Sequence, residues 1–200
     1  MHTDIQPRQF MIDDKQNVLI NDFNRGKFME YYFKNDIEGS ENDSGESTDS
    51  DVVIPCTYCM PFSHGHYRAP EELYSDPLNE GLDMWSVCYT IWNLFSYEKP
   101  WQSIGGNYEA IKYLLHDYQM RSKFPYSMPP YLKDLVRQCW RGNIYNRPDI
   151  NEFMRGMRYF YKHMHRLSDG KQLLTLAELE KTKAYKETNY PDMAKIKEYL

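Results

Sequence analysis

The chain begins with a segment whose residue types are typical of a catalytic loop. In HTDIQPRQF, Asp4 follows His2 by two residues, Pro7 follows the aspartate by three, and the amide of Gln9 stands near the end. An aspartate in such a loop can accept a proton from a substrate group. Whether this loop retains that chemistry or has lost it depends on the residues around it.

Four further motifs follow at set distances along the chain. Asp22 opens the triplet DFN eighteen residues after Asp4, and Glu71 lies in YRAPEE. Asp83, in DMWS, follows Glu71 by twelve residues, and Arg147 belongs to NRPD. Each of these charges alone would indicate no more than a solvated surface. Their order and mutual spacing are what give them weight.

Together these motifs resemble the C-terminal lobe of a eukaryotic protein kinase, from the catalytic loop to the last helix, over residues 2 to about 165. The resemblance implies an α+β fold that is mainly α: a helical C-lobe bundle with a short β hairpin and no N-lobe. It also implies ATP and Mg²⁺ as cofactors, phosphoryl transfer as the activity, and other proteins as substrates or scaffold partners.

The same resemblance assigns roles to the motif residues. Asp4 would be the proton acceptor, and Asp22 and Gln9 would stand at the magnesium-binding positions. Glu71 and Arg147 would form a buried ion pair that ties the activation segment to the lobe. Asp83 would accept hydrogen bonds from the backbone of the catalytic loop.

The departures from the family pattern fall mostly on the catalytic loop. The arginine before the aspartate is Thr3, and the lysine two residues after it is Gln6, which removes the cation expected beside the transferring phosphoryl group. The metal-binding asparagine is Gln9, one methylene longer, and Mg²⁺ tolerates misplaced ligands poorly. The glycine of the metal-binding triplet is Asn24, which can still adopt positive φ. His64 replaces the threonine that Ser/Thr kinases carry.

In the family, the glycine-rich loop, the strand lysine and its partner glutamate precede the catalytic loop, and this sequence has no residues there to supply them. As given, the chain is therefore expected to be catalytically inactive, to bind Mg-ATP weakly or not at all, and to act as a binding or scaffold module. The alternative is the C-terminal part of an active ATP-dependent kinase that phosphorylates protein Ser/Thr or Tyr.

Hydrophobic patterns predict the elements that hold these residues. Residues 10–23 indicate a strand, a turn and a strand. The apolar stretch MWSVCYTIWNLF is apolar on every side, which is typical of a buried helix, and its twelve residues are too few to cross a bilayer. Helices separated by Pro or Gly are expected at 70–74, 81–96, 107–118, 130–140 and 149–165.

Two segments differ in character from the kinase-like domain, which is predicted to span 1–165. Residues 36–51 are acidic and Ser-rich with one apolar side chain, so a disordered insert is expected within the activation segment. We expect it to stay mobile even when phosphorylated, because the loop lacks the arginine that captures a phosphate. Residues 166–200 are predicted to form a charged helical tail.

Composition limits the classes of partner. A net charge of −5 argues against a nucleic-acid surface, and no segment is expected to insert into a membrane. The polar start differs from a signal peptide, so an intracellular, cytoplasmic protein is expected.

Four cysteines are too few for a disulfide framework. Cys56, Cys59, His64 and His66 offer zinc ligands, but an ordinary loop is favoured because the histidine spacing is too short.

Overall fold

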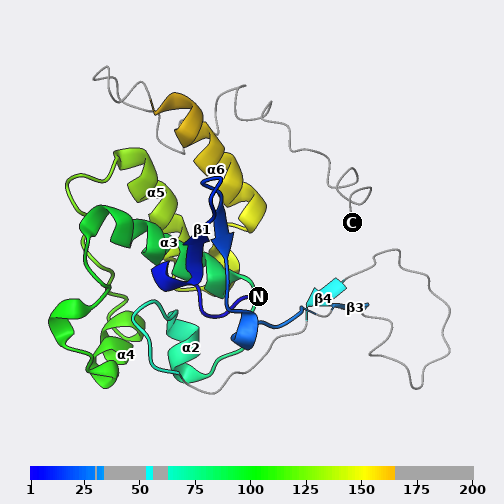
Figure 1. Ribbon diagram of the computed structural model, residues 1–200. Helices are drawn as coiled ribbons and strands as arrows, with labels where there is room; N and C mark the ends of the chain where they lie inside the picture. Colours follow the sequence, from blue (N-terminus) through cyan, green and yellow to red (C-terminus); the bar gives the residue numbers. More distant parts are fainter. Residues whose placement is uncertain (30, 34–52, 56–62, 165–200) are drawn as a thin grey trace.

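The computed structural model describes residues 1–29, 31–33, 53–55 and 63–164. Its regular elements are mainly helices, with two small antiparallel hairpins (Figure 1), so the predicted mainly α architecture with a short hairpin is confirmed. The helices are α2 (Pro70–Tyr74), α3 (Gly81–Ser96), α4 (Tyr108–His116), α5 (Pro130–Cys139) and α6 (Ile150–His163). Short 3-10 turns are η1 (Pro7–Gln9), η2 (Phe23–Arg25), η3 (Gln102–Ile104) and η4 (Ile144–Asn146).

The helix boundaries lie within about two residues of those predicted, and at α4 and α6 an N-cap side chain marks the start. At the start of α6, the Asp149 side chain accepts a hydrogen bond from the Glu152 N–H at 2.7 Å. The Glu152 carboxylate accepts in return from the Asp149 N–H at 3.2 Å. This reciprocal capping box satisfies two N–H groups that the helix leaves unpaired.

The acidic insert at 36–51 and the tail at 166–200 lie outside the described residues.

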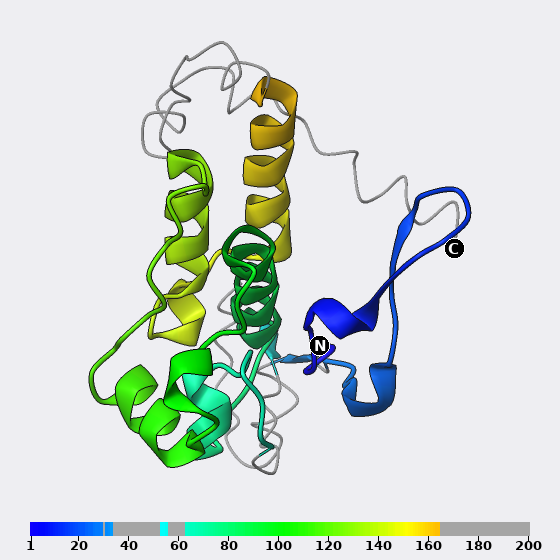
Figure 2. The ribbon, with the colours of Figure 1, turned by 60° about the vertical axis from the view of Figure 1, so that its left-hand side comes forward.

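Helix α3 supplies the core of the bundle. It packs against α5, which packs against α6 (Figure 2). Trp85, Cys88 and Tyr89 of α3 have no exposed surface, as expected for a helix that is apolar on every side. The Tyr89 ring stacks on Trp140 with 4.2 Å between centroids, and Trp140 stacks on Phe124 at 5.3 Å. These aromatic contacts make α3 a rigid base for the loops at its N-terminal end.

The predicted hairpin is present as β1 (Phe10–Ile12) and β2 (Val18–Ile20), with Met11 opposite Leu19. From Met11 onward its apolar side chains are 39–68% exposed rather than packed into the described core. A second hairpin, not predicted from the sequence, pairs β3 (Tyr31–Phe33) with β4 (Val53–Pro55). Its two strands flank the segment 34–52, and their pairing brings the two ends of that segment together.

Candidate functional site

Helix α3 anchors the catalytic loop through one carboxylate. Asp83, in the first turn of α3, accepts hydrogen bonds from the N–H groups of His2 at 2.6 Å and Thr3 at 2.8 Å. Burial raises the pKa of Asp83, and the two N–H donors act in the opposite direction. Thr3 has a left-handed backbone with φ of 62°, and its hydroxyl donates to the carbonyl of Arg25. These bonds fix the backbone directly before Asp4.

The carboxylate of Asp4 is surrounded by side-chain donors. Its Oδ1 accepts hydrogen bonds from Gln6 Nε2 and Arg68 Nη2, both at 2.9 Å, and its Oδ2 accepts from Gln9 Nε2 at 2.8 Å. Arg8 Nη2 lies 3.5 Å from Oδ2 on a side chain that is 72% exposed. A carboxylate has about four lone-pair sites. Three short hydrogen bonds and the longer Arg8 contact therefore surround the carboxylate of Asp4.

Gln9 bridges the two aspartates of the site. Its side chain is buried, and Nε2 lies 2.8 Å from Asp4 Oδ2 and 3.3 Å from Asp22 Oδ2. Asp22 has a left-handed backbone with φ of 66° between β2 and η2. The neighbouring ring of Phe23 packs on His2, with 4.8 Å between ring centroids. One amide group thus satisfies two carboxylates that would otherwise repel each other.

Arg68 is the site residue that sequence analysis left without a role. Its Nη1 donates to the carbonyl of Thr3 at 2.5 Å and to Glu72 Oε1 at 3.1 Å, while Nη2 reaches Asp4. Glu72 Oε2 accepts in turn from the N–H of Ala69 at 2.9 Å. Arg68 therefore links α2 to the catalytic loop. Its spacing of four residues from Glu72, together with Thr3 in place of the arginine before Asp4, was the available signal.

The buried position of Glu72 changes its acid–base behaviour. Burial raises the pKa of Glu72 to about 7, despite the opposing effect of the Arg68 guanidinium and the Ala69 N–H. The adjacent Glu71 raises it further by repulsion between the carboxylates. The link between α2 and the catalytic loop therefore contains a group that titrates near neutrality.

Glu71 and Arg147 form a bidentate ion pair in the interior. Arg147 Nη1 and Nη2 donate to the two Glu71 carboxylate oxygens at 2.5 and 2.8 Å, and the Arg147 side chain has no exposed surface. Nη1 also donates to the Gly81 carbonyl at 2.9 Å. A Cβ on Gly81 would lie 2.7 Å from Ile144 Cγ1. Glycine at this position lets η4 approach α3 and place Arg147.

The residues at the magnesium-binding positions can be tested against that ion. Mg²⁺ requires oxygen ligands in near-octahedral geometry, usually one or two carboxylates plus phosphate oxygens. Gln9 presents its amide nitrogen to both aspartates, because a carboxylate accepts a hydrogen bond only from a donor. Turning the amide oxygen toward Asp22 would remove the bond to Asp4. In this arrangement Gln9 offers no oxygen to Mg²⁺, and Asp22 is the carboxylate that remains at the two positions.

The zinc alternative finds no support in the described residues. His66 Nδ1 lies 2.8 Å from the carbonyl of Pro100, and the His64 ring packs on Tyr108 with 4.3 Å between centroids. Cys56 and Cys59 lie outside the described residues. Within them, no group of three or more His, Cys, Asp and Glu side chains is placed to hold a metal ion.

The two described cysteines, Cys88 and Cys139, are free thiols with no exposed surface. Burial raises the pKa of the Cys88 thiol, so it stays protonated and unreactive.

Within the described part of the chain, no helix is both long and apolar enough to cross a membrane.

Comparison with known proteins places the sequence in a family. The family model for the protein kinase domain covers residues 1–160. The chain is 28% identical over 149 residues to dual specificity protein kinase zakA of Dictyostelium discoideum, covering 74% of this chain and 17% of that protein. It is 34% identical over 90 residues to dual specificity protein kinase zak2 of the same organism, covering 44% of this chain and 14% of that protein.

A further relative is fibroblast growth factor receptor homolog 1 of Drosophila melanogaster, 26% identical over 161 residues, which are 78% of this chain and 19% of that protein. The family match covers more than half of the sequence, so the chain belongs to the protein kinase domain family. It corresponds to less than a quarter of the length of each of these relatives.

Proposed function

We propose that this member of the kinase family does not transfer phosphate and acts as a protein-binding or scaffold module. The observation that carries the proposal is the carboxylate of Asp4, which accepts hydrogen bonds from four side chains. A general base needs a lone pair directed at the proton that it abstracts. With Gln6 and Arg68 on Oδ1 and Gln9 and the more distant Arg8 on Oδ2, a substrate hydroxyl would have to displace a donor to reach the carboxylate.

The metal-binding positions support the same proposal. Asp22 is bridged to Asp4 by the amide nitrogen of Gln9, so no oxygen ligand accompanies Asp22 toward a metal. ATP in kinases is held through Mg²⁺ that neutralises its phosphates. A site that does not receive the ion would bind the nucleotide weakly.

A second candidate is an active kinase of which this chain forms the C-terminal part. In its favour, Asp4, Asp22 and the Glu71–Arg147 pair have the identities that the kinase resemblance requires. The relatives include dual specificity protein kinases and a stress-activated protein kinase. On this candidate, residues outside the present sequence would reorganise Gln9, and Mg-ATP and protein Ser/Thr or Tyr would be the substrates.

The two candidates differ in a phosphotransfer assay on the protein as its own cells express it. Labelled ATP, Mg²⁺ and a degenerate peptide library containing Ser, Thr and Tyr would be incubated with purified protein, with the Asp4→Asn variant as background. We expect label incorporation to equal that background. Incorporation tenfold above the Asp4→Asn level would refute the loss of catalysis and favour the second candidate.

A gain-of-function variant adds a second test. Gln6→Lys with Gln9→Asn restores the two family residues that bear most directly on phosphate and metal. If activity rises only in this variant, the substituted loop accounts for the loss. On either candidate, we propose that other proteins are the partners and that the protein works inside the cell.

A further inference from the structure

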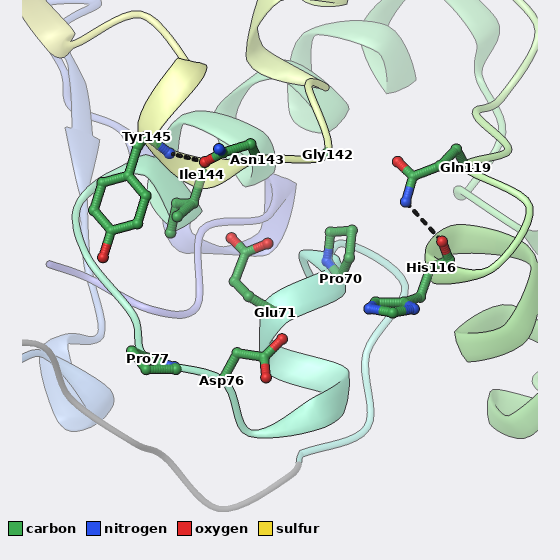
Figure 3. A pocket seen from close by; sticks show the side chains of 10 residues that line it. All are labelled: Pro70, Glu71, Asp76, Pro77, His116, Gln119, Gly142, Asn143, Ile144 and Tyr145. Atoms are coloured by element: carbon green, nitrogen blue, oxygen red, sulfur yellow. Dashed lines mark hydrogen bonds between the residues drawn. The ribbon is translucent and has the colours of Figure 1, made fainter.

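A separate cavity of about 290 Å³ lies between α2, the end of α4 and the loop that leads into η4 (Figure 3). Neither Asp4 nor Asp22 lines it. Pockets for cofactors and drug-sized ligands usually occupy about 300–1,000 Å³. The volume is therefore suited to one long side chain rather than to a nucleotide.

Part of the wall of this cavity is apolar. Pro70 and Pro77 line the side formed by α2 and the loop that follows it, and Ile144 and the Tyr145 ring line the opposite side (Figure 3). Ile144 is buried, whereas Tyr145 is 66% exposed and stands at the rim. Such walls are complementary to the methylene stem of a lysine or arginine, which packs on apolar surface while its charged end stays polar.

Hydrogen-bond acceptors line the same cavity. Asp76 is exposed, and its carboxylate has no hydrogen-bond or ion-pair partner in the described part of the chain. His116 Nδ1 lies 2.9 Å from Asp117 Oδ1. A carboxylate at Nδ1 favours the tautomer with the proton on that nitrogen, which leaves Nε2 of His116 as an acceptor. Glu71 also lines the cavity, but Arg147 neutralises it.

Two cations of neighbouring segments, Lys112 and Arg121, have contacts of their own. Lys112 Nζ lies 4.3 Å from the centre of the Tyr74 ring. Arg121 donates to Gln119 Oε1 at 3.1 Å and to backbone carbonyl groups. Neither cation forms an ion pair with Asp76. The cavity therefore combines apolar walls with a free negative charge.

From this combination we infer that the cavity binds a lysine or arginine side chain of a partner protein. The methylene stem lies between the prolines and the Tyr145 ring, and the cationic end pairs with Asp76 while one N–H reaches His116 Nε2. This site does not depend on the state of Asp4, and it serves a scaffold and an active kinase equally. It gives the chain a contact that selects basic segments of partners.

The inference is tested by titrating the full 200-residue chain with capped peptides of five residues, in which one central residue varies within an alanine sequence. The central residue is arginine, lysine, citrulline as the neutral counterpart of arginine, or glutamate. Binding is followed by NMR of ¹³C-labelled histidine and tyrosine rings, so that His116 and Tyr145 report occupancy of the cavity.

We expect the arginine and lysine peptides to shift the His116 and Tyr145 signals in a saturable way, with citrulline at least about fivefold weaker. Asp76→Asn should reduce the affinity about fivefold, a factor typical of one partly exposed ion pair, and Asp76→Glu should restore most of it. Asp14→Asn removes an exposed acid of the β1–β2 turn and serves as the matched control, with no expected effect.

Three results would overturn the inference: no saturable shift at millimolar peptide, equal binding of arginine and citrulline peptides, or undiminished binding by Asp76→Asn. Phosphotransfer by the protein would contradict the proposed function and leave this titration unchanged. Failure of either proposal can therefore be recognised separately.

Discussion

Replacing Arg147 with alanine should destabilise the folded chain strongly. The guanidinium makes four hydrogen bonds: two to Glu71, one to the Gly81 carbonyl and one from Nε to the Arg141 carbonyl at 3.0 Å. Its centre also lies 5.0 Å from the Trp85 ring centroid. Alanine would leave the Glu71 carboxylate, with 7% of its side chain exposed, as an unpaired buried charge.

Breaking a buried ion pair on one side costs about 3–5 kcal/mol. Because a domain is stable by about 5–15 kcal/mol in total, this is a large part of its stability. For a domain of this size, each kcal/mol lowers the melting temperature by about 2–4 °C, so a fall of about 6–20 °C is expected. Arg147→Lys should be intermediate, since an ammonium group cannot donate to both oxygens in the same planar geometry.

Urea unfolding followed by tryptophan fluorescence and a thermal melt by circular dichroism would measure both quantities. Arg141→Ala is the matched control: this arginine is exposed, donates to the Asn146 carbonyl, and should change stability by about 0.5 kcal/mol. The expected fall in melting temperature is at least about 6 °C. An Arg147→Ala protein that melts within 2 °C of the wild type would therefore refute the buried pair.

Three other predictions follow from the site. The pKa of Glu72 is raised from 4.5 to about 7, so the folded chain binds this proton more tightly than the unfolded chain. The free energy of unfolding should therefore fall by roughly 3 kcal/mol as pH rises from about 4.5 to about 7. Glu72→Gln should flatten this part of a pH series of urea midpoints, and an unchanged slope would count against it. Calorimetry should detect no micromolar binding of Mg-ATP to the chain, since Gln9 presents nitrogen to Asp22; micromolar binding would contradict the site geometry. Arg68→Ala should increase hydrogen exchange at the Asp4 and Ile5 amides, because the guanidinium holds the carbonyl of Thr3; unchanged exchange would show that the loop is held without it.

Much of the architecture could be predicted because it depends on local patterns. The apolar residues of α3 repeat on all sides of the helix, and only the centre of a bundle can bury such a helix. Pro148 and Asp149 mark the start of α6 by backbone and side-chain preferences that act within one turn. The short β1–β2 hairpin likewise follows from two apolar runs around a polar turn.

The meeting of Glu71 with Arg147, and of Asp83 with the catalytic loop, was expected from the family resemblance. Spacing alone does not establish such contacts, because 76 residues separate Glu71 from Arg147 and about 80 separate Asp83 from the loop. The described residues contain both contacts. The roles proposed for Asp4, Gln9 and Asp22 in chemistry stay predictions.

The surroundings of Asp4 could not be read from the sequence. Gln6 and Gln9 suggested lost groups, whereas in the folded chain both amides donate to the carboxylate. The cation beside Asp4 comes from Arg68, 64 residues away along the chain. Side-chain amides and guanidinium groups choose partners by distance in space, and packing of α2 against the loop brings these groups within hydrogen-bonding reach.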